Sequence, residues 1–169
     1  MRIFEMHTGP EAYLLLFAWV FAEQIGLPIP AVPALLAAGA LAAGSKLNVV
    51  SSAIVALTAS VLADYLWYHA GAFRSEMVGR FLRRYPNSRV LYAAEHWVRR
   101  YGARSLVFAK FVPGLSLAAP PLTGLCGTGR AEFLLFDTVG SLIWTAGFIG
   151  MGYLFNSGIH AFSVPVSLT

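Results

Sequence analysis

Four ionisable side chains stand alone inside long apolar stretches of this chain: Glu23, Asp64, Lys110 and Asp137. A carboxyl group in apolar surroundings can bind and release a proton, and a lysine can neutralise an anion such as a phosphate. An isolated charge in hydrocarbon is so costly that it is kept only where it faces protein or water. The pattern therefore indicates a polar pathway through a membrane, with Glu23 and Asp64 as proton carriers or as counter-charges of Lys110.

The two carboxylates and the lysine also have structural explanations. Lys110 lies six residues after Arg104, so its amine could extend to the membrane interface. Glu23 and Asp64 could instead form static buried ion pairs. The sequence leaves these alternatives open.

Three further residues are secondary candidates: Asp137, Arg130 and His69. Asp137 lies close to Arg130 and to the start of its predicted helix, which favours a capping or interfacial carboxylate. His69 titrates in the physiological pH range, but one turn beyond Asp64 we expect a hydrogen-bonded residue near a helix end.

Composition predicts the class of protein. Hydrophobic residues make up 57% of the 169 residues and charged residues 12%, with a mean hydropathy of +0.66. One small soluble core cannot enclose so much apolar surface. We therefore expect residues 1–169 to form a single all-α, multi-pass membrane domain. The apolar run from Tyr13 to Ala22 lacks the flanks of a signal peptide, so we expect it to be retained.

Neither a metal nor a cofactor is expected. The single cysteine, Cys126, has no partner for a disulfide or a zinc site, and the four histidines are scattered without ligand spacing.

Four apolar stretches follow one another along the chain. Residues 12–44 and 105–129 are interrupted by prolines, whereas residues 47–73 and 133–155 are continuous. A proline removes a backbone donor and clashes with the preceding turn, so the interrupted stretches should each divide into a helix, a break and a second helix. The breaks include Pro28, Pro30 and Pro33 in the first stretch and Pro113, Gly114, Pro120 and Pro121 in the second. In the last stretch, Gly147, Gly150 and Gly152 should allow close helix contact.

A basic segment separates the two halves. Residues 74–104 hold eight of the twelve lysines and arginines, which predicts a cytoplasmic loop. Apolar residues recur there at helical spacing in Phe73–Tyr85 and again in Val90–Tyr101. We expect two amphipathic helices at the membrane interface, with an anionic lipid surface as partner and no need for nucleic acid. A helical hairpin that packs on itself is the alternative.

The two interrupted stretches resemble each other. Val20, Phe21, Ala22, Ala31, Pro33 and Leu35 match Val107, Phe108, Ala109, Ala118, Pro120 and Leu122, which is six matches in sixteen positions. Glu23 and Lys110 occupy equivalent places with opposite charge. An odd number of crossings between the two copies would make an inverted repeat, as in many transporters. Helix ends at Pro113 and Gly114 would then offer amide donors to an anion beside Lys110. Proline kinks in ordinary spanning helices are the alternative.

Several motifs in order carry a family resemblance. They are Glu23 followed by Pro28-Ile-Pro30, Asp64 followed by Tyr68 and Gly71, Lys110-Phe-Val-Pro113-Gly114 leading to Pro120-Pro-Leu-Thr-Gly124, and Gly140 with Trp144. Over roughly residues 12–155 the chain resembles the DedA family of bacterial inner-membrane proteins, a branch of the VTT-domain superfamily. The resemblance implies two re-entrant hairpins facing each other across the bilayer. It also implies translocation of lipids, such as undecaprenyl phosphate or phospholipids, and a link to the proton-motive force and envelope integrity.

The chain departs from the family pattern at the cationic positions. Lys110 and Ser116 stand where the family usually has arginines. A lysine holds a phosphate as a point charge and lacks the two-pronged geometry of a guanidinium. The departures bear on the substrate more than on the fold.

We therefore predict an inner-membrane transporter of an anionic lipid carrier, with possible proton coupling and oligomerisation. The predicted site comprises Glu23, Asp64, Lys110, Pro113, Gly114 and Ser116. A proton-driven transporter of a small ion or oxyanion is one alternative, and a membrane protein of envelope homeostasis without transport is another. An enzyme is not expected, since His96 with Arg99 and Arg100 lacks a second histidine.

Overall fold

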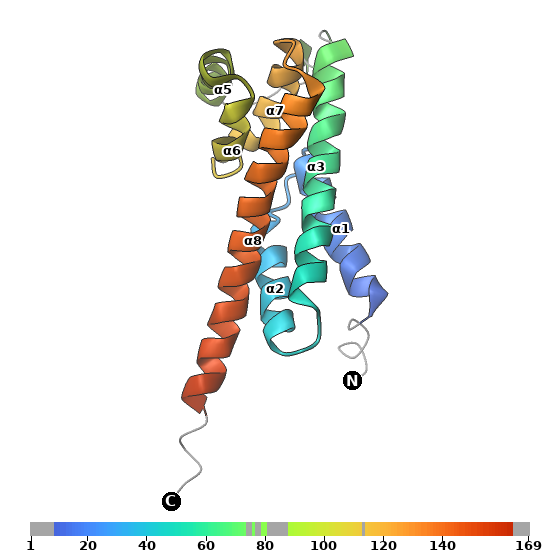
Figure 1. The fold of residues 1–169 in the computed structure, drawn as a ribbon, viewed down its shortest axis with the longest axis vertical. Coiled ribbons are helices and arrows are strands. Elements are labelled where there is room, and N and C mark those ends of the chain that lie inside the picture. Colours follow the sequence, from blue (N-terminus) through green and yellow to red (C-terminus); the bar gives the residue numbers. More distant parts are fainter. Residues whose placement is uncertain (1–8, 74–75, 77–78, 81–87, 113, 164–169) are drawn as a thin grey trace, which may run out of the picture. The chain divides into compact units, whose positions relative to one another are not determined.

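The computed structural model describes residues 9–73, 76, 79–80, 88–112 and 114–163, and these residues form helices and no strands (Figure 1). The helices are α1 (Pro10–Gln24), α2 (Val32–Ala43), α3 (Val49–Phe73), α5 (Ser88–Tyr101), the 3₁₀ turn η1 (Gly102–Arg104), α6 (Ser105–Ala109), α7 (Leu115–Leu125) and α8 (Arg130–Ser163). The predicted all-α class is confirmed for this part of the chain.

Two helices are long and apolar enough to cross a membrane. They cover Val49–Phe73, with 25 residues and a mean hydropathy of 1.8, and Arg130–Gly158, with 29 residues and 1.5. At about 1.5 Å per residue, each exceeds the roughly 30 Å of a hydrocarbon core. The first agrees with the predicted span of residues 47–73, and α8 is longer at both ends than the predicted 133–155.

The first proline-rich stretch contains a helix, a break and a helix. After α1 ends at Gln24, Gly26 adopts a φ of +107°, which few side-chain-bearing residues tolerate. Pro28 and Pro30 lie in the break, and the indole N–H of Trp19 donates a hydrogen bond to the Pro30 carbonyl at 3.0 Å. Pro33 does not extend the break, because it occupies the first turn of α2, where a proline needs no hydrogen-bonding N–H.

The second proline-rich stretch is broken beside Gly114, as predicted, but not at its two later prolines. The interruption lies between α6 and α7, where Gly114 has a φ of +84°. Pro113 falls outside the described residues. Pro120 and Pro121 were expected among the breaking residues, and this is wrong, because both lie inside α7. The helix continues there because Ala118–Gly124 are all buried by packing, and the Thr123 hydroxyl also donates a bond to the Pro120 carbonyl at 2.7 Å.

The described contacts divide the chain into two units. The first comprises Met1–Glu23, Pro28–Ala59 and Thr145–Thr169, and the second comprises Gln24–Leu27 and Ser60–Trp144.

In the first unit, α2 packs against the C-terminal half of α8 through two glycines. A Cβ added to Gly39 would collide with the backbone of Ile149, and one added to Gly152 would collide with the backbone of Leu36. Each helix thus places a glycine against the backbone of the other helix. On α2, Gly39 is three residues from Leu36, the residue that Gly152 contacts, and on α8, Gly152 is three residues from Ile149, the residue that Gly39 contacts. The Asn156 amide adds a hydrogen bond to the Ala40 carbonyl at 3.1 Å.

The second unit repeats this contact between α7 and the C-terminal half of α3. A Cβ on Gly124 would collide with the Tyr68 backbone, and one on Gly71 would collide with the Pro121 backbone. The three-residue spacing is the same as in the first unit. Tyr68 also stacks on Phe133, with ring centroids 4.4 Å apart, and its hydroxyl donates a 2.5 Å bond to the Thr128 carbonyl.

Two of the glycines expected at helix contacts are not close to other helices. A Cβ added to Gly147 or Gly150 would meet no described residue within 4 Å, whereas one added to Gly152 would collide with α2. Close approach therefore depends on the face of α8 that meets α2, and a glycine count along the helix does not reveal that face.

Helix α5 is one of the two predicted amphipathic helices, and it lies beside α7 in the second unit (Figure 1). Ala94 and Val98 are buried in the apolar cluster that includes Leu115 and Ala118, while Tyr92 and Tyr101 are exposed. Part of its apolar face is thus covered by protein instead of lipid. Contact of the exposed face with a membrane stays a prediction, and most of the other predicted helix, Phe73–Tyr85, lies outside the described residues.

Candidate functional site

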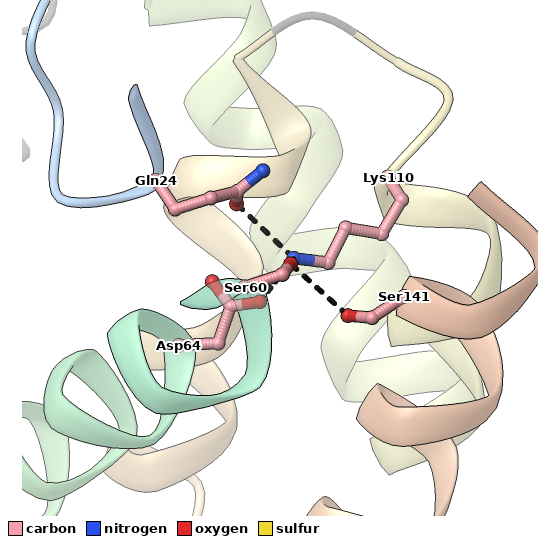
Figure 2. Close-up of polar contacts among 5 residues, drawn as sticks. All are labelled: Gln24, Ser60, Asp64, Lys110 and Ser141. Carbon is pink, nitrogen blue, oxygen red and sulfur yellow. Dashed lines mark hydrogen bonds and ion pairs between the residues drawn. The ribbon is translucent and has the colours of Figure 1, made fainter. Parts of the chain in front are cut away.

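The side chain of Lys110 is enclosed in the second unit and is only 2% exposed. Its ammonium group forms an ion pair with the Asp64 carboxylate and donates hydrogen bonds to the Ser60 hydroxyl at 2.7 Å and to the Gln24 side-chain carbonyl at 3.1 Å (Figure 2). A lysine has three N–H donors, and here each has an acceptor. Lys110 is therefore a buried cation whose donors are all bonded to protein acceptors. The alternative that its amine extends to the membrane interface is wrong.

The cluster continues to α8 through a pair of hydroxyl groups. Ser60 and Ser141 approach with their oxygens 3.2 Å apart (Figure 2). The Ser60 oxygen accepts from Lys110, so its own proton is available for Ser141. The two serines thus connect the ammonium group to a third helix.

Asp137 belongs to the same cluster, which corrects its assignment as a cap or an interfacial carboxylate. Helix α8 begins at Arg130, so Asp137 lies two turns inside it, and its side chain is fully buried. It interacts electrostatically with Asp64 and Lys110. No described residue donates a hydrogen bond to either of its carboxyl oxygens. The prediction failed because distance along the chain from a helix start does not tell which face is buried.

Helical spacing explains how three separate segments supply these groups. Ser60 and Asp64 are four residues apart on α3, and Asp137 and Ser141 are four residues apart on α8, so each pair shares one helix face. Lys110 follows the last residue of α6. A Cβ on Gly140 would lie 2.9 Å from the Val107 Cα, so this glycine lets α6 approach α8 closely. The close approach brings Lys110 to the face that carries Asp137.

The cluster contains two carboxyl groups and one ammonium group, all buried. Asp64 and Asp137 are both 0% exposed. If both carboxyls were ionised, one negative charge would lack a counter-ion among the described residues, which is strongly unfavourable away from water. The arrangement is suited to exchanging protons and to holding an anion at the lysine. The described residues contain no group of three histidine, cysteine or acidic side chains that could hold a metal ion.

The other predicted site residues lie at separate places along the chain. Glu23 is half-buried near the end of α1 in the first unit, and its role with Lys110 stays a prediction. Gly114 immediately precedes α7, and Ser116 is half-buried in its first turn. His69 packs edge-on against Tyr65 at 4.4 Å between ring centroids, and Arg130 is exposed at the start of α8. Pro113 lies outside the described residues.

Sequence reasoning missed Gln24, Ser60 and Ser141. A usable signal existed for the serines, since each lies four residues from an isolated aspartate on an otherwise apolar helix. Gln24 is 4% exposed and adjoins Glu23, which drew attention because it is charged. A neutral amide suits a lysine already paired with a carboxylate, because it accepts a bond and adds no charge.

Fold and site together define a class: a helical membrane protein with a buried lysine–carboxyl cluster where a broken helical segment meets two long helices. Comparison with known proteins agrees. The family model of the VTT domain matches residues 29–154. Protein DedA of Escherichia coli (strain K12) is 28% identical over 159 residues, covering 88% of this chain and 71% of the relative.

Two further relatives cover similar shares of the chain. Uncharacterized membrane protein YbfM of Bacillus subtilis (strain 168) is 23% identical over 158 residues, covering 90% of this chain and 95% of the relative. Undecaprenyl phosphate transporter A of Staphylococcus aureus (strain NCTC 8325 / PS 47) is 24% identical over 164 residues, covering 89% and 81%. No solved structure matches the chain significantly. The chain belongs to the VTT-domain family and is a DedA family membrane protein.

Proposed function

We propose that this protein is a membrane transporter that moves an anionic lipid carrier of the polyprenyl phosphate type across the inner membrane, with Lys110 as the cation that receives the headgroup. The observation that carries the proposal is the enclosed ammonium group of Lys110, held by Asp64, Ser60 and Gln24 next to a helix break. A relative named as an undecaprenyl phosphate transporter supports the substrate class.

The chemistry of the cluster suits a transient anion. An ammonium group binds a phosphate oxygen as it binds a carboxylate oxygen, so a headgroup can take the place of Asp64 at Lys110. The serine and glutamine side chains can remain as neutral partners during the exchange. A headgroup enclosed in this way is shielded from the hydrocarbon that opposes its crossing.

An apolar groove in the first unit supports a lipid over a hydrated solute. It has a volume of about 180 Å³ and lies between α1, α2 and Leu47. Its lining consists of apolar side chains: Ala12, Leu15, Leu16, Trp19, Ala34, Ala37, Ala38, Leu41 and Leu47. Hydrocarbon fits such a surface, whereas a small ion gains nothing from it.

We propose no enzymatic activity and no cofactor for this chain. His96 is exposed on α5, and its neighbour Arg99 is paired with Glu95 at 2.9 Å on the same surface. The ion pair with Glu95 thus engages Arg99, one of the arginines that a phosphate-cleaving site would need.

The test is translocation of labelled undecaprenyl phosphate in liposomes that contain the purified protein. We expect Lys110→Ala to lower the rate at least about tenfold, because loss of a charge-assisted contact of this kind is worth about 1.5–3 kcal/mol. Lys110→Arg should keep part of the rate, since it keeps the positive charge. Lys46→Ala is the matched control, because Lys46 is exposed.

Two outcomes would contradict the proposal. Equal rates for wild type and Lys110→Ala would exclude a role for the lysine in headgroup transfer. Proton uptake that requires a small oxyanion and no lipid would favour an ion transporter instead. A parallel assay with Glu23→Gln tests the predicted contribution of that carboxylate.

A further inference from the structure

The buried cluster has two carboxyl groups but only one ammonium group. Binding of an anion at Lys110 does not explain the second carboxyl group. Asp64 pairs with Lys110, and Asp137 is a second fully buried carboxyl beside both. Among the described residues, these two are the charged groups that interact electrostatically with Asp137. Two ionised carboxylates would leave one buried negative charge uncompensated, and burial strongly disfavours that state. One proton on the carboxyl pair restores neutrality.

Hydrogen bonding decides which carboxyl holds this proton. One Asp64 oxygen accepts directly from the Lys110 ammonium group, which stabilises the ionised form of Asp64. Asp137 receives no hydrogen bond from any described residue at either carboxyl oxygen. An ionised carboxylate needs donors, whereas a protonated carboxyl group is itself a donor and needs fewer. The proton therefore belongs on Asp137.

We propose that Asp137 holds the resting proton of the Asp64–Asp137 pair, and that loss of this proton prevents an anionic headgroup from binding at Lys110. The second part rests on the proposed function. With Asp137 neutral, the cluster carries no net charge. A headgroup that approaches Lys110 then meets no carboxylate of the cluster other than Asp64, which is paired with the lysine. With Asp137 ionised, the cluster is negative and repels the headgroup.

The same charge count gives a stoichiometry. An anion that replaces Asp64 at Lys110 leaves the Asp64 carboxylate without its counter-ion. One further proton, taken up by Asp64, keeps the cluster neutral while the anion is bound. Binding of one singly charged headgroup is thus accompanied by uptake of one proton, and both are released together.

The experiment compares wild type with Asp137→Asn, which has nearly the same shape but cannot ionise. Infrared spectra of the purified protein, recorded as the pH is raised, report the protonated-carboxyl stretching band without any transport. We expect wild type to lose such a band on titration and Asp137→Asn to lack it from the start. Glu95→Gln, which alters a partly exposed carboxylate on α5, should leave the band unchanged.

The second readout is binding and translocation of undecaprenyl phosphate against pH in liposomes. As the pH rises, the proton taken up by Asp64 should lower both in wild type by up to about tenfold per pH unit, and above the titration of Asp137, where two protons are needed, by up to about a hundredfold per pH unit. Asp137→Asn should stay active at pH values where wild type has declined. Elution from a size-exclusion column monitors whether the variant is folded.

The outcomes separate this inference from the proposed function. A band that persists in Asp137→Asn would overturn the inference, as would a pH profile of that variant identical to the wild-type profile. A wild-type spectrum that lacks the band and responds to added sodium would indicate a bound cation in place of the proton and would also overturn it. If Asp137→Asn removes the band but wild type moves no lipid, the proton site holds and the lipid transporter proposal fails.

Discussion

At the scale of single residues, the informative feature is that every N–H donor of one buried lysine has an acceptor. Lys110 has three acceptors from three different side chains: Gln24, Ser60 and Asp64. A buried charge with all its donors bonded is tolerated, but it adds little to stability relative to an apolar replacement of the whole pair. Retention of so polar a cluster in an apolar protein is better explained by function than by folding.

Charge compensation inside the cluster predicts a specific pattern of stability. Lys110→Met should destabilise the protein by about 3–5 kcal/mol, because it leaves buried carboxyls without their cation. The loss should grow as the pH rises, since Asp64 and Asp137 must then be kept protonated against a falling proton concentration. The double variant Lys110→Met with Asp64→Leu should recover most of the loss. Thermal unfolding in detergent at several pH values measures all three effects.

Recovery of stability in that double variant should not restore lipid translocation, because no cation remains for the headgroup. If the single and double variants were equally unstable, the pair would contribute to the fold itself, and a purely functional explanation of the cluster would be wrong. Lys46→Met provides a matched control at an exposed lysine.

At the scale of helices, the two units share one mode of contact. A glycine on the short helix and a glycine on the long helix each admit the partner's backbone, in the pairs Gly39–Ile149 and Gly152–Leu36 and again in Gly124–Tyr68 and Gly71–Pro121. Helices in lipid associate largely through such close packing, because no hydrophobic driving force acts between them there. The same contact recurs with the same spacing in both units, and the internal repeat stays a prediction. The contact also indicates that each short helix packs on the long helix from the other half of the sequence.

Two glycines on α8 provide a direct test. Gly152→Ala should destabilise the protein by about 1–3 kcal/mol, because the added methyl group meets the rigid backbone of α2. Gly150→Ala, two residues away in open space, should be neutral or stabilising by up to about 1 kcal/mol through its helix propensity. Melting temperatures in detergent compare the two variants. Equal tolerance at both positions would show that the close contact is not maintained in the membrane.

At the scale of the whole molecule, both long helices contribute to both units. The start of α3 belongs to the first unit and its end to the second, whereas the start of α8 belongs to the second unit and its end to the first. Most of the basic residues lie in one segment, residues 74–104, between the two halves of the sequence. The distribution of charge therefore predicts one orientation in the membrane, with this segment in the cytoplasm.

Chemical labelling can test this orientation. Tyr92 is 74% exposed on α5, so Tyr92→Cys in a Cys126→Ser background places a single accessible thiol in the basic segment. A membrane-impermeant maleimide should label it in inside-out vesicles and leave it unlabelled in intact spheroplasts. Cys126→Ser alone controls for unspecific labelling. Labelling of intact spheroplasts would place the segment on the outer side and contradict the charge argument.

The sequence by itself determined the helical class, the two long apolar helices and the two interrupted stretches, because these depend on local properties. Length and hydropathy define α3 and α8, and glycine and proline constrain the backbone wherever they occur. Lys110 and Asp64 could be selected as candidates for the same reason, since a charge in an apolar stretch is unusual whatever its partners.

Only the tertiary structure decided which charges meet. Asp137 joins Asp64 and Lys110, and Gln24, Ser60 and Ser141 complete the cluster, because Gly140 lets α6 approach α8 and a shared helix face presents residues four apart. Pro120 and Pro121 continue α7 for a similar reason, since their burial by tertiary packing outweighs their local preference. These outcomes depend on contacts between segments far apart in the chain, which local pattern alone does not specify.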